Sequence, residues 1–286
     1  MVIELQQKAE WLDNDVETVI SLFLSRIGGG DGVLLESADA DGRWGRFSLA
    51  AGKFLFSAVC RQGQLALTIN DRRLNGLKSF EGQPYFEGLR RVMAAIHIQP
   101  DADLPPFPPI TRGLYGYLGY EAAALLNENL AAHLRAEEAE AAFALPGELY
   151  LFDHSYNQLA RLSLIDGEAV GRDHKPGCSA IEIGKIRFSS DWDGFRQAAF
   201  VIKDLAAAGQ IREATLSTQF SAPLTGDLFQ AYRRLRQLDP SPYMFFLRRP
   251  EVILATSSPE VLVTCDEGRL ALNPIAGSRP RGRDLS

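Results

Sequence analysis

The chain has 286 residues, of which 46% are hydrophobic and 23% are charged, and this composition fits a globular protein of one large domain or two ordinary ones. Its formal net charge of −6 argues against a general binder of nucleic acid or of anionic membranes, because such a protein would carry a basic face. The three cysteines are widely separated, the N-terminus has no apolar leader and no stretch is long enough to span a bilayer, so we expect reduced thiols, no zinc site and a cytoplasmic location.

The first part of the chain predicts a helix followed by a series of strands. Apolar residues recur at helical spacing over residues 16–27, after possible capping residues at 13–15. The glycine-rich run at 28–32 follows this helix, whereas a phosphate-binding loop comes before one, so we interpret the run as a helix stop. Apolar stretches between turn residues predict strands at 33–37, 47–49, 53–59, 64–69, 113–121 and 148–154. Two further segments, 85–96 and 121–143, predict helices, and a proline-rich loop lies at 101–109.

The second part begins after a polar segment, 166–186, that we interpret as a linker. Helices are expected at 192–208 and from Thr225 to 235, and strands at 213–220, 240–247, 252–256, 269–272 and 274–276. Short turns join many adjacent strands, so the order predicts an α+β protein with antiparallel sheets rather than a doubly wound parallel sheet. The four histidines have no acidic or cysteine partner at ligand spacing and are interpreted as structural: His97, His133, His154 and His174.

The loop at 273–282, Asn-Pro-Ile-Ala-Gly-Ser-Arg-Pro-Arg-Gly, is the strongest candidate site. Its backbone N–H groups, the hydroxyl of Ser278 and the guanidiniums of Arg279 and Arg281 would suit a small ligand that carries carboxylates. The chain ends four residues after this loop, at Ser286, so we expect the domain to be incomplete.

Five segments, taken together in their order and spacing, resemble anthranilate synthase component I, a chorismate-using enzyme. They are 34–39 (Leu-Leu-Glu-Ser-Ala-Asp), 209–220, 239–246, 257–260 and 274–282. The resemblance is weak from about residue 10 to 180 and strong from about 190 onward. It implies an α+β fold, an antiparallel β-sheet sandwich flanked by helices that is incomplete at the C-terminus. It also implies an N-terminal region at 1–180 and the first part of a chorismate-binding domain at 188–286.

The family converts chorismate and ammonia to anthranilate and pyruvate with Mg²⁺, and a glutamine amidotransferase subunit supplies the ammonia from glutamine. The resemblance places chorismate contacts at Gly277 and Ser278, where glycine permits close backbone approach and the hydroxyl can donate a hydrogen bond. Serine stands where the family usually has threonine, which keeps the hydroxyl. Ala276 stands where aminodeoxychorismate synthase commonly has a nucleophilic lysine, so it favours free ammonia and anthranilate synthase. Aminodeoxychorismate synthases without that lysine remain an alternative.

A second set of residues resembles the family's feedback site for tryptophan. Glu36 and Ser37 could accept hydrogen bonds from an α-ammonium, and Pro242, Tyr243 and Met244 would form a wall for the indole. Asp239 stands where the family usually has asparagine, and by position alone Arg43 and Arg46 could pair with a carboxylate. The two arginines are interpreted as exposed, so the residues that we expect to bind tryptophan as an inhibitor are Glu36, Ser37, Pro242, Tyr243 and Met244.

The acid/base histidine and the metal-binding glutamates of the family have no counterpart in this sequence. No histidine follows His174, and Glu251, Glu260 and Glu267 do not match the metal ligands. We therefore expect no catalytic or metal-binding residue in this segment and no turnover by these residues alone. Besides the two synthases, a non-catalytic tryptophan-binding module is a third interpretation, and no nucleic-acid or membrane partner is expected.

Overall fold

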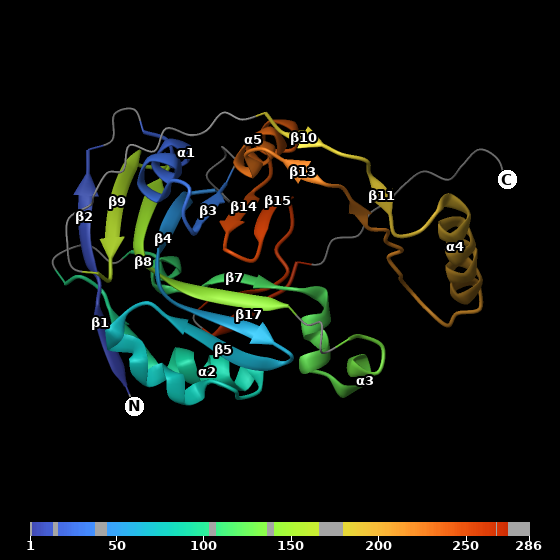
Figure 1. The fold of residues 1–286 in the computed structure, drawn as a ribbon, viewed down its shortest axis with the longest axis horizontal. Helices are drawn as coiled ribbons and strands as arrows, with labels where there is room; N and C mark the ends of the chain where they lie inside the picture. The colour runs from blue at the N-terminus through green and yellow to red at the C-terminus, as the bar shows by residue number, and fades with distance from the viewer. Residues whose placement is uncertain are drawn as a thin grey trace. The chain divides into compact units, whose positions relative to one another are not determined.

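The computed structural model describes residues 2–13, 17–37, 45–102, 107–135, 140–165, 180–266 and 268–273. The chain divides into two compact units, of which the first comprises Met1–Pro176 and Tyr232–Ser286 and the second Gly177–Ala231 (Figure 1). The division falls inside helix α5 (Leu228–Leu238). These compact units do not test the domain boundaries expected from the sequence, so the regions 1–180 and 188–286 remain a prediction.

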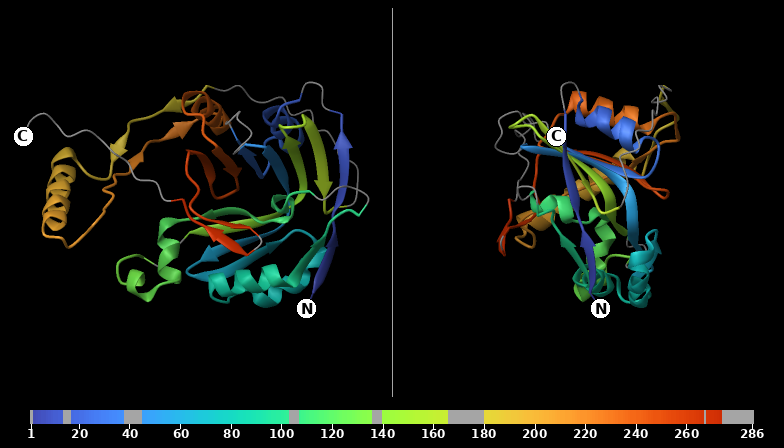
Figure 2. Two further views of the ribbon diagram at one scale, coloured as in Figure 1. Left: turned by 180° about the vertical axis from the view of Figure 1, so that it is seen from behind. Right: turned by 90° about the vertical axis from the view of Figure 1, so that its left-hand side faces the viewer.

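A nine-stranded sheet, antiparallel in every pairing, dominates the first unit (Figure 2). Its strand order is β15-β14-β3-β4-β8-β9-β2, with β5 also paired to β4 and β7 to β8. The strands are β2 (Lys8–Leu12), β3 (Gly32–Glu36), β4 (Phe47–Arg61), β5 (Gln64–Ile69), β7 (Tyr115–Leu118), β8 (Ala141–Asp153), β9 (Gln158–Ser163), β14 (Tyr243–Arg248) and β15 (Ile253–Ser258). This large antiparallel sheet confirms the predicted α+β class. The pairing of β14 with β3 also joins segments from the two ends of the sequence.

Strand β4 differs from the prediction of two short strands separated at Gly52. It is one strand of 15 residues whose pairing with β8 shifts register between Phe54 and Phe56. Lys53, just before the shift, has a positive φ of 52°. The irregularity that the sequence suggested as a turn is therefore a bulge inside a continuous strand, where the local twist increases.

The first predicted helix begins later than expected. Thr18, rather than a residue at 13–15, caps α1 (Val19–Leu22): its hydroxyl accepts from the backbone of Ser21, and the Ser21 hydroxyl accepts from Thr18 in return. A π-helical segment η1 (Phe23–Ile27) continues α1 and ends at Gly28, whose φ of 66° suits glycine. The predicted helix stop at this glycine is confirmed.

A second helical region covers the other end of this sheet. Helix α2 (Tyr85–Ala95) and the 3₁₀ segment η2 (Arg72–Phe80) pack with β5 on a core that includes Leu65, Leu74 and Val92. The structure confirms the helix predicted at 85–96, except that Ile96 already begins strand β6 (Ile96–Gln99), which pairs in parallel with β1 (Ile3–Gln6).

The helix predicted over 121–143 is wrong. Its described residues form η4 (Tyr120–Leu125), the single turn α3 (Glu128–Ala131) and the start of β8, while 136–139 lie outside the described residues. The Ala- and Glu-rich composition favours a helix locally, but pairing of Ala141 and Ala142 with β7 and β4 overrides it. The segment η3 (Pro109–Arg112) precedes β7.

The second unit contains helix α4 (Trp192–Ala207), capped by Asp191, and confirms the helix predicted there. Two short ladders accompany it: β10 (Glu182–Ile183) with β13 (Leu224–Thr225), and β11 (Arg187–Phe188) with β12 (Phe220–Ser221). The strand predicted at 213–220 is wrong except for its last residue. Thr225 lies in β13 and does not cap α5, since Asp227 accepts the hydrogen bond from the backbone of Phe229 instead.

In the first unit, β16 (Thr264–Asp266) and β17 (Arg269–Ala271) form a hairpin that corresponds to the strand predicted at 269–272. The strand predicted at 274–276 lies outside the described residues. Within the part of the chain that the structure describes, no helix is long and apolar enough to cross a membrane.

Candidate functional site

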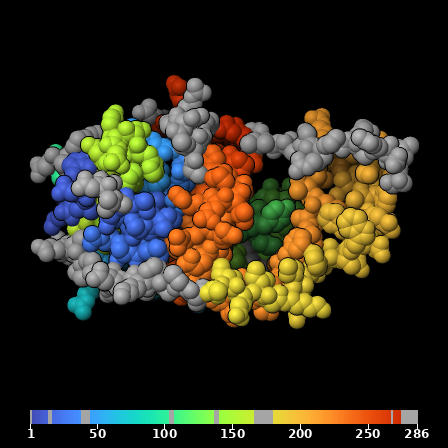
Figure 3. Space-filling model, turned by 90° about the horizontal axis from the view of Figure 1, so that it is seen from above, coloured from blue at the N-terminus to red at the C-terminus, as the bar shows by residue number. Residues whose placement is uncertain are grey.

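Strands β3 and β14 bring together two of the motifs that the sequence singled out. In their antiparallel register Glu36 lies directly opposite Met244, and Tyr243, the next residue of β14, lies opposite Ser258 of β15. Figure 3 shows N-terminal segments in blue beside the orange surface that includes α5. The candidate inhibitor residues therefore lie at neighbouring ends of paired strands.

Glu36 is a buried carboxylate that links the sheet to α5. Its side chain is 3% exposed; the Tyr232 hydroxyl donates to Oε2 at 2.8 Å, and the Arg236 Nε donates to Oε1 at 2.9 Å. Burial raises the pKa of Glu36, and the hydrogen bonds and charge of these two partners only partly offset that rise. Both oxygens already accept a hydrogen bond, so an α-ammonium at Glu36 would have to share an oxygen with Tyr232 or Arg236.

Ser37 presents the opposite situation, an unused hydroxyl. Its Oγ is buried and has no hydrogen-bond partner among the described residues, while its backbone N–H donates to Ser48 Oγ at 3.3 Å. Ser48 Oγ is in turn hydrogen-bonded to His154 Nε2 at 2.7 Å. An unsatisfied buried hydroxyl is costly, so Ser37 is the residue here that is best placed to gain from a polar ligand.

His154 holds Ser48 beside Ser37. Burial lowers the pKa of His154, the charge of Asp153 raises it by less, and Arg236 lowers it further, so the ring favours the neutral form. Its ring also packs on Phe152, with centroids 4.7 Å apart. The structural role of this histidine remains a prediction, and no signal in the sequence indicates its link to Ser37 through Ser48.

Arg46 is occupied elsewhere. Its Nε and Nη2 donate to Asp153 Oδ2 at 2.9 and 2.7 Å, and the guanidinium lies over the rings of Phe47 and Tyr156. A ligand carboxylate would have to compete with Asp153 for this arginine. Arg43 lies outside the described residues.

The predicted indole wall of Pro242, Tyr243 and Met244 does not form one surface. Met244 is 1% exposed, whereas Tyr243 is 38% exposed and Pro242 is half-buried. Successive residues of a strand point to opposite faces, so Met244 shares the face of Glu36, and Tyr243 points to the other face. A ligand at this junction would contact Met244 and Tyr243 from different sides of β14.

The predicted chorismate contacts Gly277 and Ser278, together with Ala276, lie outside the described residues, so they remain predictions. In the described ranges, no group of three or more His, Cys, Asp or Glu side chains lies together in a way that could hold a metal ion.

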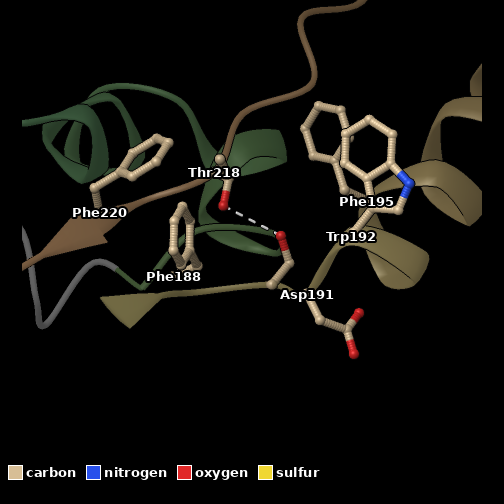
Figure 4. A pocket seen from close by; sticks show the side chains of 7 residues that line it. Phe188, Asp191, Trp192, Phe195, Thr218 and Phe220 are labelled. Atoms are coloured by element: carbon tan, nitrogen blue, oxygen red, sulfur yellow. Dashed lines mark hydrogen bonds between the residues drawn. The ribbon is translucent and has the colours of Figure 1, made fainter. Parts of the chain in front are cut away.

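The second unit has an aromatic cavity of about 650 Å³ (Figure 4). Phe188, Trp192 and Phe220 line it and are each more than half exposed, and Ser190 Oγ is hydrogen-bonded to Thr218 Oγ1 at 3.2 Å. Asp191, the one carboxylate among the described lining residues, accepts from the backbone of Gly194 as the cap of α4. The described lining offers no paired acid and base for chemistry.

Comparison with known proteins identifies proteins to which this chain is similar. Residues 70–286 match the chorismate binding enzyme family. The chain is 31% identical over 288 residues to anthranilate synthase component 1 of Thermus thermophilus, a match that covers 94% of this chain and 59% of the relative. It is 28% identical over 285 residues to anthranilate synthase component 1 of Geobacillus stearothermophilus, with 87% and 55% covered. It is also 27% identical over 270 residues to aminodeoxychorismate synthase component 1 of Bacillus subtilis, with 88% and 55% covered.

A solved structure supports the same fold. The chain matches anthranilate synthase component I from Streptococcus pneumoniae with a TM-score of 0.55 and 20% sequence identity, over 79% of this chain and 53% of that one. The chain thus spans somewhat more than half the length of the relatives that it matches.

Proposed function

This chain belongs to the chorismate-binding enzyme family, and from that premise we propose that it is part of an anthranilate synthase component I. The proposed reaction converts chorismate and ammonia to anthranilate and pyruvate. The observation that supports the proposal is the register of β3 and β14, because it sets Glu36 opposite Met244, two residues of the set that resembles the family's tryptophan site. The relatives named as component 1 support a partner subunit, which we propose to be a glutamine amidotransferase that supplies the ammonia.

In this proposal Gly277 and Ser278 contact chorismate, through close backbone approach and a donated hydroxyl proton. Ala276 has no nucleophilic group, which leaves room for ammonia to attack the substrate ring. Mg²⁺ would supply charge stabilisation for the departing and developing anions. The described residues offer no group that fits this ion, so we assign no ligand to it and derive no step through it.

Product analysis tests the proposal. The complete reading frame, supplied with chorismate, Mg²⁺ and ammonium, is expected to release anthranilate and pyruvate in equal amounts, measured by fluorescence and by a coupled pyruvate assay. Aminodeoxychorismate as the sole product would overturn the proposal in favour of the alternative, aminodeoxychorismate synthase. Ala276→Lys is the matched variant, and we expect it to lose anthranilate formation because the lysine amine occupies the path of ammonia.

We also propose that tryptophan binds at the junction of β3 and β14 as a feedback inhibitor, with Glu36, Ser37, Pro242, Tyr243 and Met244 around it. The buried Ser37 hydroxyl, which has no hydrogen-bond partner in the described ranges, supports this because a ligand donor would satisfy it. Tryptophan binding without any turnover in the complete reading frame would instead favour a non-catalytic binding module.

Two substitutions test this inhibitor site. Ser37→Phe fills the space beside the hydroxyl and Met244→Thr removes an apolar contact, so each is expected to weaken tryptophan binding at least about tenfold in calorimetry. Ser79→Phe and Met93→Thr make the same changes at exposed positions and should leave the affinity unchanged. Equal affinity in all four variants would show that the mapping is wrong.

A further inference from the structure

A polar cavity of about 470 Å³ lies in the first unit, apart from the residues assigned above. Segment η1, the glycine-rich run after it and the bulged part of β4 enclose it. Its lining residues are Arg26, Ile27, Gly30, Asp31, Lys53, Phe54 and Asn70. The volume lies within the range of small-molecule sites, and the lining combines an apolar wall with charged and amide groups.

Arg26 is the unexplained residue of this cavity. Its Nε atom is buried and has no hydrogen-bond partner among the described residues, and none of the described carboxylates forms an ion pair with it. A buried guanidinium nitrogen without an acceptor is unfavourable, and such an atom in a native protein calls for a missing partner. Arg26 also lies on the π-helical segment η1, a geometry that is frequent at functional sites.

Two glycines hold the backbone of Arg26 against the sheet. A Cβ at Gly32 would lie 2.4 Å from the Ile27 side chain, and a Cβ at Gly52 would lie 2.9 Å from it. The absence of both side chains lets Ile27 pack onto β3 and β4. This packing fixes η1, and therefore Arg26, at the rim of the cavity.

The other charged groups of the lining already have partners. Lys53, with its unusual positive φ, places its ammonium 2.7 Å from the buried carboxylate of Glu148. Asp31 pairs with Arg249 at 3.3 Å. Among the described residues, the cavity therefore has one positive charge without a partner, that of Arg26, beside the Lys53 ammonium, which can still donate a hydrogen bond.

We propose that this cavity binds the anionic group of a small molecule that carries a single negative charge, a carboxylate or a phosphate monoester in its singly protonated form, with Arg26 as its main partner. A guanidinium offers paired N–H donors that match the oxygens of either group. The amide of Asn70 and the ammonium of Lys53 lie on the same lining, and Asp31 disfavours a more highly charged ligand. In this proposal the glycine-rich run forms part of the cavity wall, and Arg26, which precedes it, binds the anion. The site therefore differs from a phosphate-binding loop, in which a helix N-terminus binds the anion.

The test uses two probes, inorganic phosphate and benzoate, titrated into the protein in a buffer free of other oxyanions. Saturable binding of at least one probe is expected, and the probe that binds identifies the source of the anion, phosphate or carboxylate. Arg26→Gln should weaken that binding at least about tenfold, because it removes a charge-assisted pair of hydrogen bonds. Arg91→Gln removes the same charge from an exposed pair with Glu87 on α2 and should leave binding unchanged.

Circular dichroism would show whether Arg26→Gln folds, and Asp31→Asn is a second variant that tests the proposal if it does not. Asp31→Asn removes the opposing carboxylate and is expected to tighten anion binding several-fold. The absence of saturable binding of both probes to the wild type would overturn the proposal. Unchanged affinity in a folded Arg26→Gln, or in Asp31→Asn, would overturn it as well.

Discussion

Replacing Glu148 with alanine is expected to lower the free energy of unfolding by about 3–5 kcal/mol, because it breaks a buried ion pair from one side only. The Glu148 side chain is 1% exposed and accepts from Lys53 at 2.7 Å and from Arg161 at 2.8 Å. Arg161 is itself 8% exposed, and Glu10, another of its partners, is half exposed. Loss of Glu148 would remove the buried carboxylate that pairs with this guanidinium.

The pH dependence of stability gives an independent measure of this pair. Burial raises the pKa of Glu148, but the hydrogen bonds and charges of Lys53 and Arg161 outweigh it and hold the pKa below 4.5. A lowered folded pKa contributes stability that is present above the unfolded value and is lost as the pH falls through the folded value. The difference between wild type and Glu148→Ala should therefore shrink in acid.

Urea unfolding at neutral and acidic pH measures both effects. Glu87→Ala is the matched control, since its pair with Arg91 is exposed and should contribute at most about 0.5 kcal/mol. A loss in Glu148→Ala no larger than that of the control would contradict the expected role of the buried pair.

Elements with a clear local pattern could be predicted from the sequence. The prediction fails where the secondary structure of a segment depends on the strands that pair with it. The helices at 85–96 and 192–208 have clear periodicity, and both form. The continuous strand β4 was not predictable, since its passage through Gly52 and Lys53 depends on pairing with β3 and β8. The helix expected at 121–143 fails for the same reason, because β8 takes its last residues into the sheet.

The candidate site was predictable only in its motifs. The resemblance groups Glu36 and Met244 in one site, but their direct pairing depends on the topology of the sheet. Their neighbours on α5 were missed, although Tyr232 and Arg236 are four residues apart and so lie on one face of a helix. That spacing predicts that Tyr232 and Arg236 share a helix face, but it does not indicate that this face contacts a buried carboxylate at the end of β3.

Replacing Glu36 with alanine is expected to lower the free energy of unfolding by about 2–3 kcal/mol at pH 4.5, because it removes the carboxyl oxygen that accepts from the buried Tyr232 hydroxyl. Arg236 is 46% exposed and can turn to water, so it adds little to this loss. Tyr232→Phe removes the donor instead, and the two substitutions should be strongly non-additive in a double-mutant cycle.

The sign of the pH dependence separates Glu36 from Glu148. Burial raises the pKa of Glu36 above 4.5, so the stability that this group contributes is fully present below pH 4.5 and is lost as the pH rises through the folded pKa. The gap between wild type and Glu36→Ala should therefore narrow from pH 4.5 to pH 8, opposite to the trend for Glu148→Ala. A gap that stays constant or widens would mean that Glu36 is held as a carboxylate, as an acceptor for an α-ammonium needs to be. A narrowing gap would mean that the carboxyl mainly fixes α5 to β3, and that Ser37 carries the larger part of ligand recognition at this junction.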